Sequence, residues 1–153
     1  MTEEQYITAL KNNPHGVRNI PNPTEEMQLV CVEQNGMLLQ YIKNPTDRVI
    51  ETALAQSPRA IQYVDNPSDE LLISLVKQDW EVLEYIQHPS DDVVRIALDQ
   101  SGWAIRYITN PSEELQLRAV ETQYDALQYI ANPSERVQMA AVKFNYLSLR
   151  YIQ

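Results

Sequence analysis

The amino-acid sequence repeats itself every 22 residues. One proline and one tyrosine mark the period at fixed points: Pro23, Pro45, Pro67, Pro89, Pro111 and Pro133, and Tyr41, Tyr63, Tyr85, Tyr107, Tyr129 and Tyr151. Two residues that keep one spacing without an insertion indicate a single supersecondary unit stacked along the chain. With the proline as position 1, the repeats are residues 1–22, 23–44, 45–66, 67–88, 89–110, 111–132 and 133–153. We therefore predict one repeat-built domain over residues 1–153.

Each repeat contains two segments with helical patterning. Apolar residues recur at positions 5, 9 and 10, as in Leu115, Ala119 and Val120, which is the spacing of one helix face. A second start signal follows at position 13, and apolar residues return at positions 17 and 20, as in Leu83 and Ile86. A β-strand interpretation fails because the apolar residues do not alternate. The pattern predicts a helix of about 12 residues and then one of about 7.

The start of each repeat carries helix N-terminal signals, as in the run Asn110-Pro111-Ser112-Glu113. We predict that the asparagine is the N-cap and that the proline takes the first helical position, where no N–H donor is needed. The acidic residue at position 3 is expected to reach back to the cap.

Helices this short are marginal in isolation, so packing between repeats must supply the stability. The sequence therefore predicts an all-α fold, an α-solenoid of seven two-helix repeats in a right-handed superhelix. The first repeat has Gln5 and Asn19 where later repeats have an apolar residue and the tyrosine. A solenoid needs a polar terminal repeat, so we expect these two residues to face solvent.

Two strings carry a family resemblance: residues 32–41 read VEQNGMLLQY, and residues 110–120 read NPSEELQLRAV. They resemble a family of tandem 22-residue helical repeats of bacteria and large tailed phages. The layout is also similar to leucine-rich-repeat-variant α-solenoids. The resemblance covers the whole chain and implies the solenoid fold. It implies no activity, because such repeats serve as scaffolds and a fold does not fix a function.

Charge and composition narrow the classes of partner. The net charge of −9 argues against direct binding of nucleic acid or anionic membrane and favours a protein partner with a basic surface. No apolar stretch approaches the roughly 18 residues of a membrane span, and the acidic start shows no signal peptide. Cys31, the only cysteine, excludes an intrachain disulfide and fits a reducing cytoplasm. We expect a cytoplasmic protein, in the host cytoplasm if a phage encodes it.

Catalytic and metal-binding patterns are not recognisable in the sequence. His15 and His88 are the only histidines, and Cys31 stands at a core position, so no Cys/His nucleophile pair or zinc set forms. The three glycines make no phosphate loop. We therefore expect no enzyme activity, no cofactor and no metal.

Acidic residues at positions 3 and 4 form a stripe along the repeats: Glu25, Glu26, Asp47, Asp69, Glu70, Asp91, Asp92, Glu113 and Glu114. Helix capping explains such a stripe, since carboxylates stabilise helix N-termini. The alternative is a nucleic-acid mimic that occupies a basic groove. Geometry favours capping, because stacked helices lie about 8–10 Å apart and phosphates of one DNA strand about 3.4 Å apart.

Positions 14 and 15 vary most and collect large side chains: Met37, Trp80, Trp103, Tyr124 and Tyr146. Tryptophan and tyrosine often dominate interface energies, so this ridge is the first candidate for a partner-binding surface. The alternative is that these side chains fill gaps between helix pairs. The tyrosines at position 19 are expected to be structural, with buried rings in six equal environments.

The seventh repeat keeps its apolar residues to the end of the sequence. Val142, Phe144, Leu149 and Ile152 are therefore candidates for self-association, including a homodimer, or for docking of a partner. The alternative is that Phe144, Tyr146 and Arg150 fold over this face and shield it.

The sequence as a whole favours a non-enzymatic protein-binding repeat module. A sharper form of this hypothesis is a phage-type inhibitor that blocks a host nucleic-acid-handling or defence complex, for example a CRISPR effector. The alternative is a structural solenoid that self-assembles through its C-terminal repeat.

Overall fold

The computed structural model of the protein describes residues 1–152. These residues form seven α-helices of ten residues, each followed by a six-residue 3-10 helix, and contain no β-strand. The α-helices are α1 (Glu3–Asn12), α2 (Glu25–Gln34), α3 (Asp47–Gln56), α4 (Asp69–Gln78), α5 (Asp91–Gln100), α6 (Glu113–Thr122) and α7 (Glu135–Phe144). The 3-10 helices are η1 (Pro14–Asn19), η2 (Gly36–Tyr41), η3 (Pro58–Tyr63), η4 (Trp80–Tyr85), η5 (Gly102–Tyr107), η6 (Tyr124–Tyr129) and η7 (Tyr146–Tyr151). The all-α prediction is confirmed.

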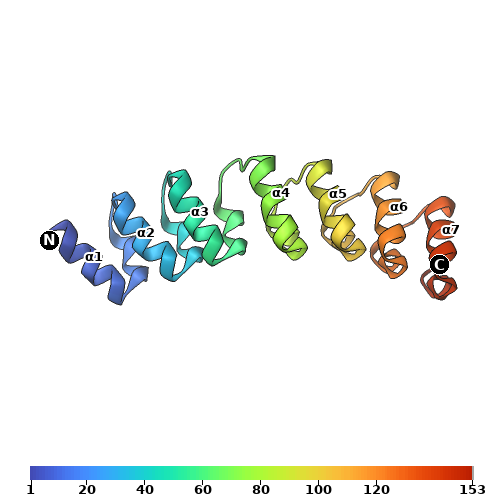
Figure 1. The fold of residues 1–153 in the computed structure, drawn as a ribbon, viewed down its shortest axis with the longest axis horizontal. Helices are drawn as coiled ribbons and strands as arrows, with labels where there is room; N and C mark the ends of the chain where they lie inside the picture. The colour runs from blue at the N-terminus through green and yellow to red at the C-terminus, as the bar shows by residue number, and fades with distance from the viewer. Residues whose placement is uncertain (153) are drawn as a thin grey trace. The chain divides into compact units, whose positions relative to one another are not determined.

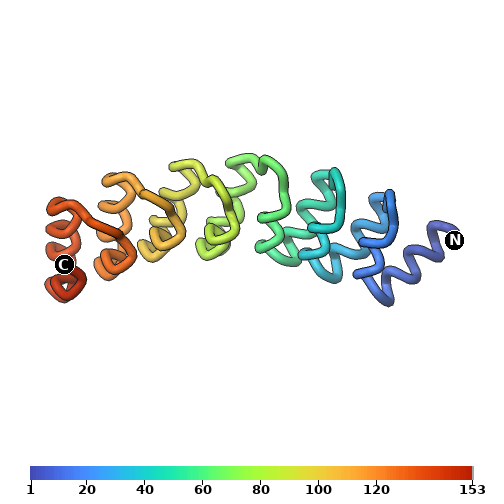
Figure 2. Tube along the Cα trace, turned by 180° about the vertical axis from the view of Figure 1, so that it is seen from behind, coloured from blue at the N-terminus to red at the C-terminus, as the bar shows by residue number. Residues whose placement is uncertain are grey.

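The chain divides into two compact units, Met1–Pro67 and Ser68–Gln153. In the first unit α1, α2 and α3 pack against one another in chain order, and in the second α4 to α7 do the same (Figure 1, Figure 2). Within each unit every 3-10 helix also contacts that of the next repeat. Each unit is therefore a stack of two-helix repeats, as an α-solenoid requires. A single domain and a right-handed superhelix over the whole chain stay predictions.

The helix start differs from the prediction. The N-cap of each α-helix is a serine or threonine at position 2, as in Ser112, whose hydroxyl accepts a hydrogen bond from the Leu115 N–H at 3.3 Å. The proline therefore lies before the cap, outside the helix. The preceding asparagine has a left-handed backbone, with φ of 48–51°, in four repeats: Asn44, Asn66, Asn110 and Asn132. The predicted asparagine cap is wrong because asparagine tolerates left-handed φ, which this connection uses.

The predicted lengths were slightly too long, and the second helix is of the 3-10 type. The residue at position 13 ends the α-helix with an extended backbone and begins the 3-10 helix, as Asn35 does with φ −154°. Its amide oxygen accepts a hydrogen bond from the Met37 N–H at 3.0 Å. Position 13 is therefore a second helix start, as predicted. Pro14 and Pro58 also lie in the first turn of their 3-10 helices, as predicted.

Small residues at position 9 place the repeats close together. Cys31, Ala97 and Ala119 are fully buried. The glycines at position 14 show how near the backbones come, since a Cβ on Gly102 would lie 2.2 Å from the Ala119 carbonyl oxygen.

Gln5 and Asn19 of the first repeat are exposed, as expected for a polar terminal repeat. None of the helices in residues 1–152 has the length and apolar character needed to cross a membrane.

Candidate functional site

The acidic residues at position 3 connect neighbouring repeats. In four places the N-cap hydroxyl of one repeat donates a hydrogen bond to the position-3 carboxylate of the repeat before it, at 2.6–2.7 Å: Thr24 to Glu3, Thr46 to Glu25, Ser90 to Asp69, and Ser134 to Glu113. The predicted bond from this acid back to its own cap is wrong, because the acid is the first helical residue and the next repeat brings a hydroxyl within reach. The stripe therefore has a structural role.

Arginines neutralise another part of the acidic stripe. Arg95 of α5 bridges Asp92 at 2.9 Å and Glu114 of α6 at 3.0 Å. Outside the stripe, Arg118 of α6 pairs with Asp99 of α5 at 2.7 Å. The hydrogen bond from Arg95 lowers the pKa of Glu114, and that from Arg118 lowers the pKa of Asp99.

All nine residues of the predicted stripe are exposed, both those with the bonds above and the remaining four: Glu26, Asp47, Glu70 and Asp91. The observed bonds favour the structural interpretation of the stripe. Nucleic-acid mimicry stays a prediction.

The five predicted ridge residues all lie in 3-10 helices, at the first or second residue. Met37 belongs to the unit Met1–Pro67, and the other four belong to Ser68–Gln153. Trp103 and Tyr146 are exposed, whereas Met37, Trp80 and Tyr124 are half-buried. The ridge is therefore mixed, with three of its members partly packed.

The ridge of the second unit holds its aromatic rings in fixed contacts. The indole N–H of Trp103 donates to the Asp125 carboxylate at 2.8 Å. The Trp80 ring lies 6.3 Å from the Tyr107 ring. The guanidinium of Arg106 lies 5.7 Å from the Trp80 ring centroid and donates to the Tyr107 hydroxyl. Rigid aromatic groups of this kind cost little entropy when a partner binds.

The position-19 tyrosines are not buried, contrary to prediction. Tyr41 is 42% exposed, Tyr129 is 40% exposed, and Tyr63, Tyr107 and Tyr151 are half-buried. Each tyrosine is the last residue of its 3-10 helix. A tyrosine that recurs at one position of every repeat is consistent with burial, but an equivalent surface position gives the same pattern.

Sequence reasoning missed Arg106 as a member of the ridge, and it placed Asp125 at ridge position 15 without foreseeing its bond to Trp103. The sequence offers no regular signal for these contacts, because the residues at positions 15 and 18 change from repeat to repeat.

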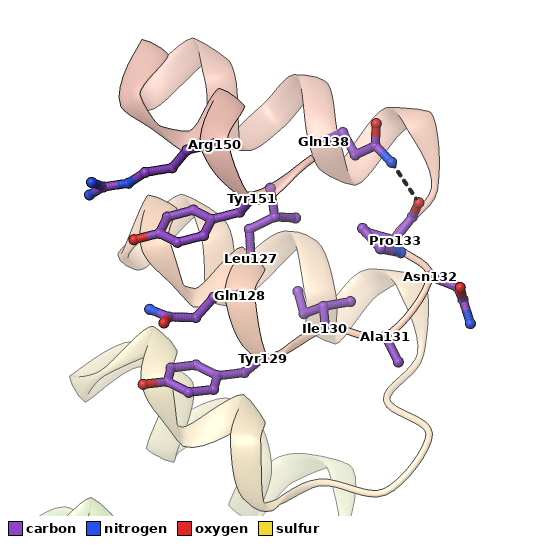
Figure 3. Close-up of a pocket in the computed structure, with 10 residues that line it drawn as sticks. All are labelled: Leu127, Gln128, Tyr129, Ile130, Ala131, Asn132, Pro133, Gln138, Arg150 and Tyr151. Atoms are coloured by element: carbon purple, nitrogen blue, oxygen red, sulfur yellow. Dashed lines mark hydrogen bonds between the residues drawn. The ribbon is translucent and has the colours of Figure 1, made fainter. Parts of the chain in front are cut away.

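A cavity of about 720 Å³ lies between the sixth and seventh repeats. Tyr129 and Tyr151 stand on its two sides, and Gln128 lies between them (Figure 3). Apolar surface comes from Leu127 and Ile130. The remaining lining residues are Ala131, Asn132, Pro133, Gln138 and Arg150. The cavity is open and mixed in polarity, which suits a side chain or peptide segment better than a buried cofactor.

The seventh repeat exposes apolar side chains, as predicted. Leu149 is 57% exposed, whereas Leu83 and Leu127 at the same position are 1% exposed. Because Leu149 itself is exposed, Phe144, Tyr146 and Arg150 do not cover this side chain, contrary to the alternative of a shielded face. Phe144 and Tyr146 are exposed as well, at 61% and 71%. Val142 and Ile152, two further members of the predicted patch, are half-buried.

The side chains considered for chemistry are two histidines and one cysteine. His15 and His88 are exposed, and the described residues contain no group of three or more His, Cys, Asp or Glu placed to hold a metal ion. Cys31 is buried, and burial raises the pKa of its thiol to about 11. A thiol with so high a pKa is a poor nucleophile near neutral pH.

Comparisons of the chain with models of protein families, with curated proteins and with solved structures found no match.

Proposed function

We propose that the protein is a non-enzymatic protein-binding repeat module that presents the aromatic ridge of its second unit to a partner. The observation that supports this proposal is the set of fixed aromatic side chains at the exposed edge, from Trp80 and Trp103 to Tyr129. Rigid aromatic anchors of this kind carry most of the binding energy at many protein interfaces. The partner has a basic surface, because this chain has a net charge of −9.

A sharper proposal is that the partner is a host nucleic-acid-handling or defence complex, for example a CRISPR effector, which the protein inhibits by covering a basic surface. It rests on the resemblance to phage repeats and on the acidity of the chain. The carboxylates that carry internal hydrogen bonds and ion pairs are partly neutralised, so the ridge supports the proposal better than the stripe does.

The test is capture of a partner from the native host and measurement of its affinity for purified variants. Trp103→Ala should weaken binding at least about tenfold, as for an interface hot spot. Tyr41→Ala removes an exposed aromatic side chain from the other unit and serves as the control. Affinity should also fall as salt rises. Equal binding by wild-type protein and Trp103→Ala would show that the ridge is not the interface.

A second candidate is self-association through the seventh repeat, which the exposure of Leu149 favours. If the protein self-associates, its average mass in solution should rise with protein concentration. The double variant Leu149→Glu and Ile152→Glu should stay monomeric. Lys77→Glu, an exposed change in α4, is the control. A wild-type mass that stays monomeric up to high concentration would exclude this candidate.

A further inference from the structure

The side chain at position 18 distinguishes the gap between successive tyrosines in the fifth repeat from that in the sixth. In the fifth repeat this residue is Arg106. Its guanidinium carbon lies 4.7 Å from the ring centroid of Tyr107 and 6.0 Å from that of Tyr129. Both contacts are within cation–π range, so an arginine of the chain itself occupies this gap.

In the sixth repeat the same position holds Gln128, which leaves the gap open. Its amide nitrogen donates back to the Asp125 carbonyl oxygen at 3.0 Å, so the side chain does not extend across the gap. The cavity of about 720 Å³ between Tyr129 and Tyr151 is the result (Figure 3).

The first unit has a related cavity at the second repeat, lined by one tyrosine instead of two. Gln40 donates to the Met37 carbonyl oxygen at 3.0 Å. A cavity of about 520 Å³ lies beside Gln40 and is lined by Tyr63. A folded-back glutamine at position 18 therefore lies beside a cavity in the second and sixth repeats.

The open cavity has the chemistry that a guanidinium requires. Tyrosine rings stand on two sides and attract a cation through their faces. The amide nitrogens of Gln128 and Gln138 donate to backbone carbonyls at 3.0 and 3.1 Å, which leaves the amide oxygens as acceptors. Arginine brings a planar cation that stacks on aromatic rings and carries five N–H donors.

We propose that the cavity between Tyr129 and Tyr151 binds an arginine side chain of the partner protein, in the place that Arg106 takes one repeat earlier. This inference rests on the proposed protein-binding function and names the chemistry of the partner. Residues 67–132 carry twelve acidic and four basic side chains, so the neighbouring repeats attract a basic segment.

Among the residues that the structure describes, Arg150 is the one charged residue that lines the cavity. Its guanidinium carbon lies 5.1 Å from the Tyr151 ring centroid, on the side of that ring away from Tyr129 (Figure 3). A like charge at this place weakens binding of a cation and would strengthen binding of an anion. Whether removal of the Arg150 charge strengthens or weakens binding therefore shows whether the bound group is a cation or an anion.

The probe is the peptide acetyl-Gly-Arg-Gly-Arg-Gly-amide, titrated at low salt while the ring protons of Tyr129 and Tyr151 are followed by NMR. The matched peptide carries citrulline, which has nearly the same shape without the charge. We expect shifts at both rings and about tenfold tighter binding of the arginine peptide. Equal binding of the citrulline peptide, or no shift at these rings, would overturn the proposal.

Three variants sharpen the test. Gln128→Arg should fill the gap as Arg106 does and weaken peptide binding about tenfold. Gln87→Arg adds the same charge at an exposed position outside the cavity and should leave binding nearly unchanged. Arg150→Gln should strengthen binding. Unaltered affinity in Gln128→Arg, or weaker binding in Arg150→Gln, would contradict an arginine site.

The partner assay separates this proposal from the general function. If Trp103→Ala abolishes partner binding and Gln128→Arg does not, the ridge binds the partner and the arginine site is wrong. If Gln128→Arg abolishes partner binding and Trp103→Ala does not, the arginine site stands and the tryptophan is not an anchor.

Discussion

At the scale of single residues, the Asn-Pro pair shows how one sequence signal fits two structures. Asparagine is favoured both as an N-cap and in left-handed backbone, and Asn110 has φ 51°. The hydroxyl of Ser112, two residues later, caps the helix instead. The pattern of apolar residues is the same in both cases, so the sequence could locate the helix start only to within two residues.

Substitution of Asn110 tests the left-handed conformation. Asn110→Gly should leave the free energy of unfolding nearly unchanged, whereas Asn110→Val should lower it by about 1–2 kcal/mol, because a Cβ branch is strained at this φ. Urea denaturation measures both. Asn22→Val is the control, since Asn22 also precedes a proline but is not among the residues with positive φ. An equal loss in both valine variants would contradict this account.

Cys31 provides a second test at this scale. Burial raises the pKa of its thiol to about 11, so the thiolate is scarce at pH 8. A thiol reagent should label the folded protein slowly and the urea-unfolded protein within the mixing time. Rapid labelling of the folded protein would show that the side chain is accessible.

At the scale of the elements, junctions between neighbouring repeats decide the structure. The period, the helical class and the buried positions 9, 10 and 17 could be predicted, since each is a local pattern. The 3-10 type of the second helix could not, because six residues between two caps satisfy α-helical and 3-10 spacing alike. The exposed tyrosines could not be predicted either, because their environment depends on the adjacent repeat.

Gly102→Ala tests the close approach of α6 to η5. The new Cβ would lie 2.2 Å from the Ala119 carbonyl oxygen, and relief requires the junction to open. We expect a loss of about 1–3 kcal/mol in the free energy of unfolding by urea denaturation. Gly16→Ala is the matched control, because the nearest atom there is a flexible side-chain carbon of Leu10 at 3.4 Å. A tolerated Gly102→Ala would mean that the junction is more pliable than the structure indicates.

The ion pairs between α5 and α6 predict a pH dependence. The pKa values of Asp99 and Glu114 are lower in the folded protein than their ordinary values. Both carboxylates therefore stabilise the fold at any pH above the ordinary values. This stabilisation is lost as the pH falls through the lowered folded-state pKa values. The melting temperature should fall below about pH 4. Arg118→Gln should lower the melting temperature at neutral pH and reduce the further drop in acid. A parallel drop in both proteins would show that these pairs contribute nothing.

At the scale of the whole molecule, stability comes from the packing of repeats against one another, because a single repeat would not stay folded alone. Deletion of residues 111–132 removes one repeat and keeps the register of the rest. The melting temperature and the urea m-value should both fall, because fewer interfaces and less buried surface remain. An unchanged melting temperature would contradict stacking as the source of stability.

The candidate site was predicted only in outline, because the aromatic residues are visible in the sequence and the contacts of Arg106 and Gln128 are not.

The hydroxyl-to-carboxylate bonds between repeats have a consequence for how such a chain grows. The same pair of groups meets at each of these junctions, and neither group depends on the residues that form the ridge. A whole repeat can therefore be duplicated, deleted or exchanged, because the new neighbours form the same hydroxyl-to-carboxylate hydrogen bond. The ridge residues can change without loss of this contact between repeats, so one stacking arrangement can present many different binding surfaces.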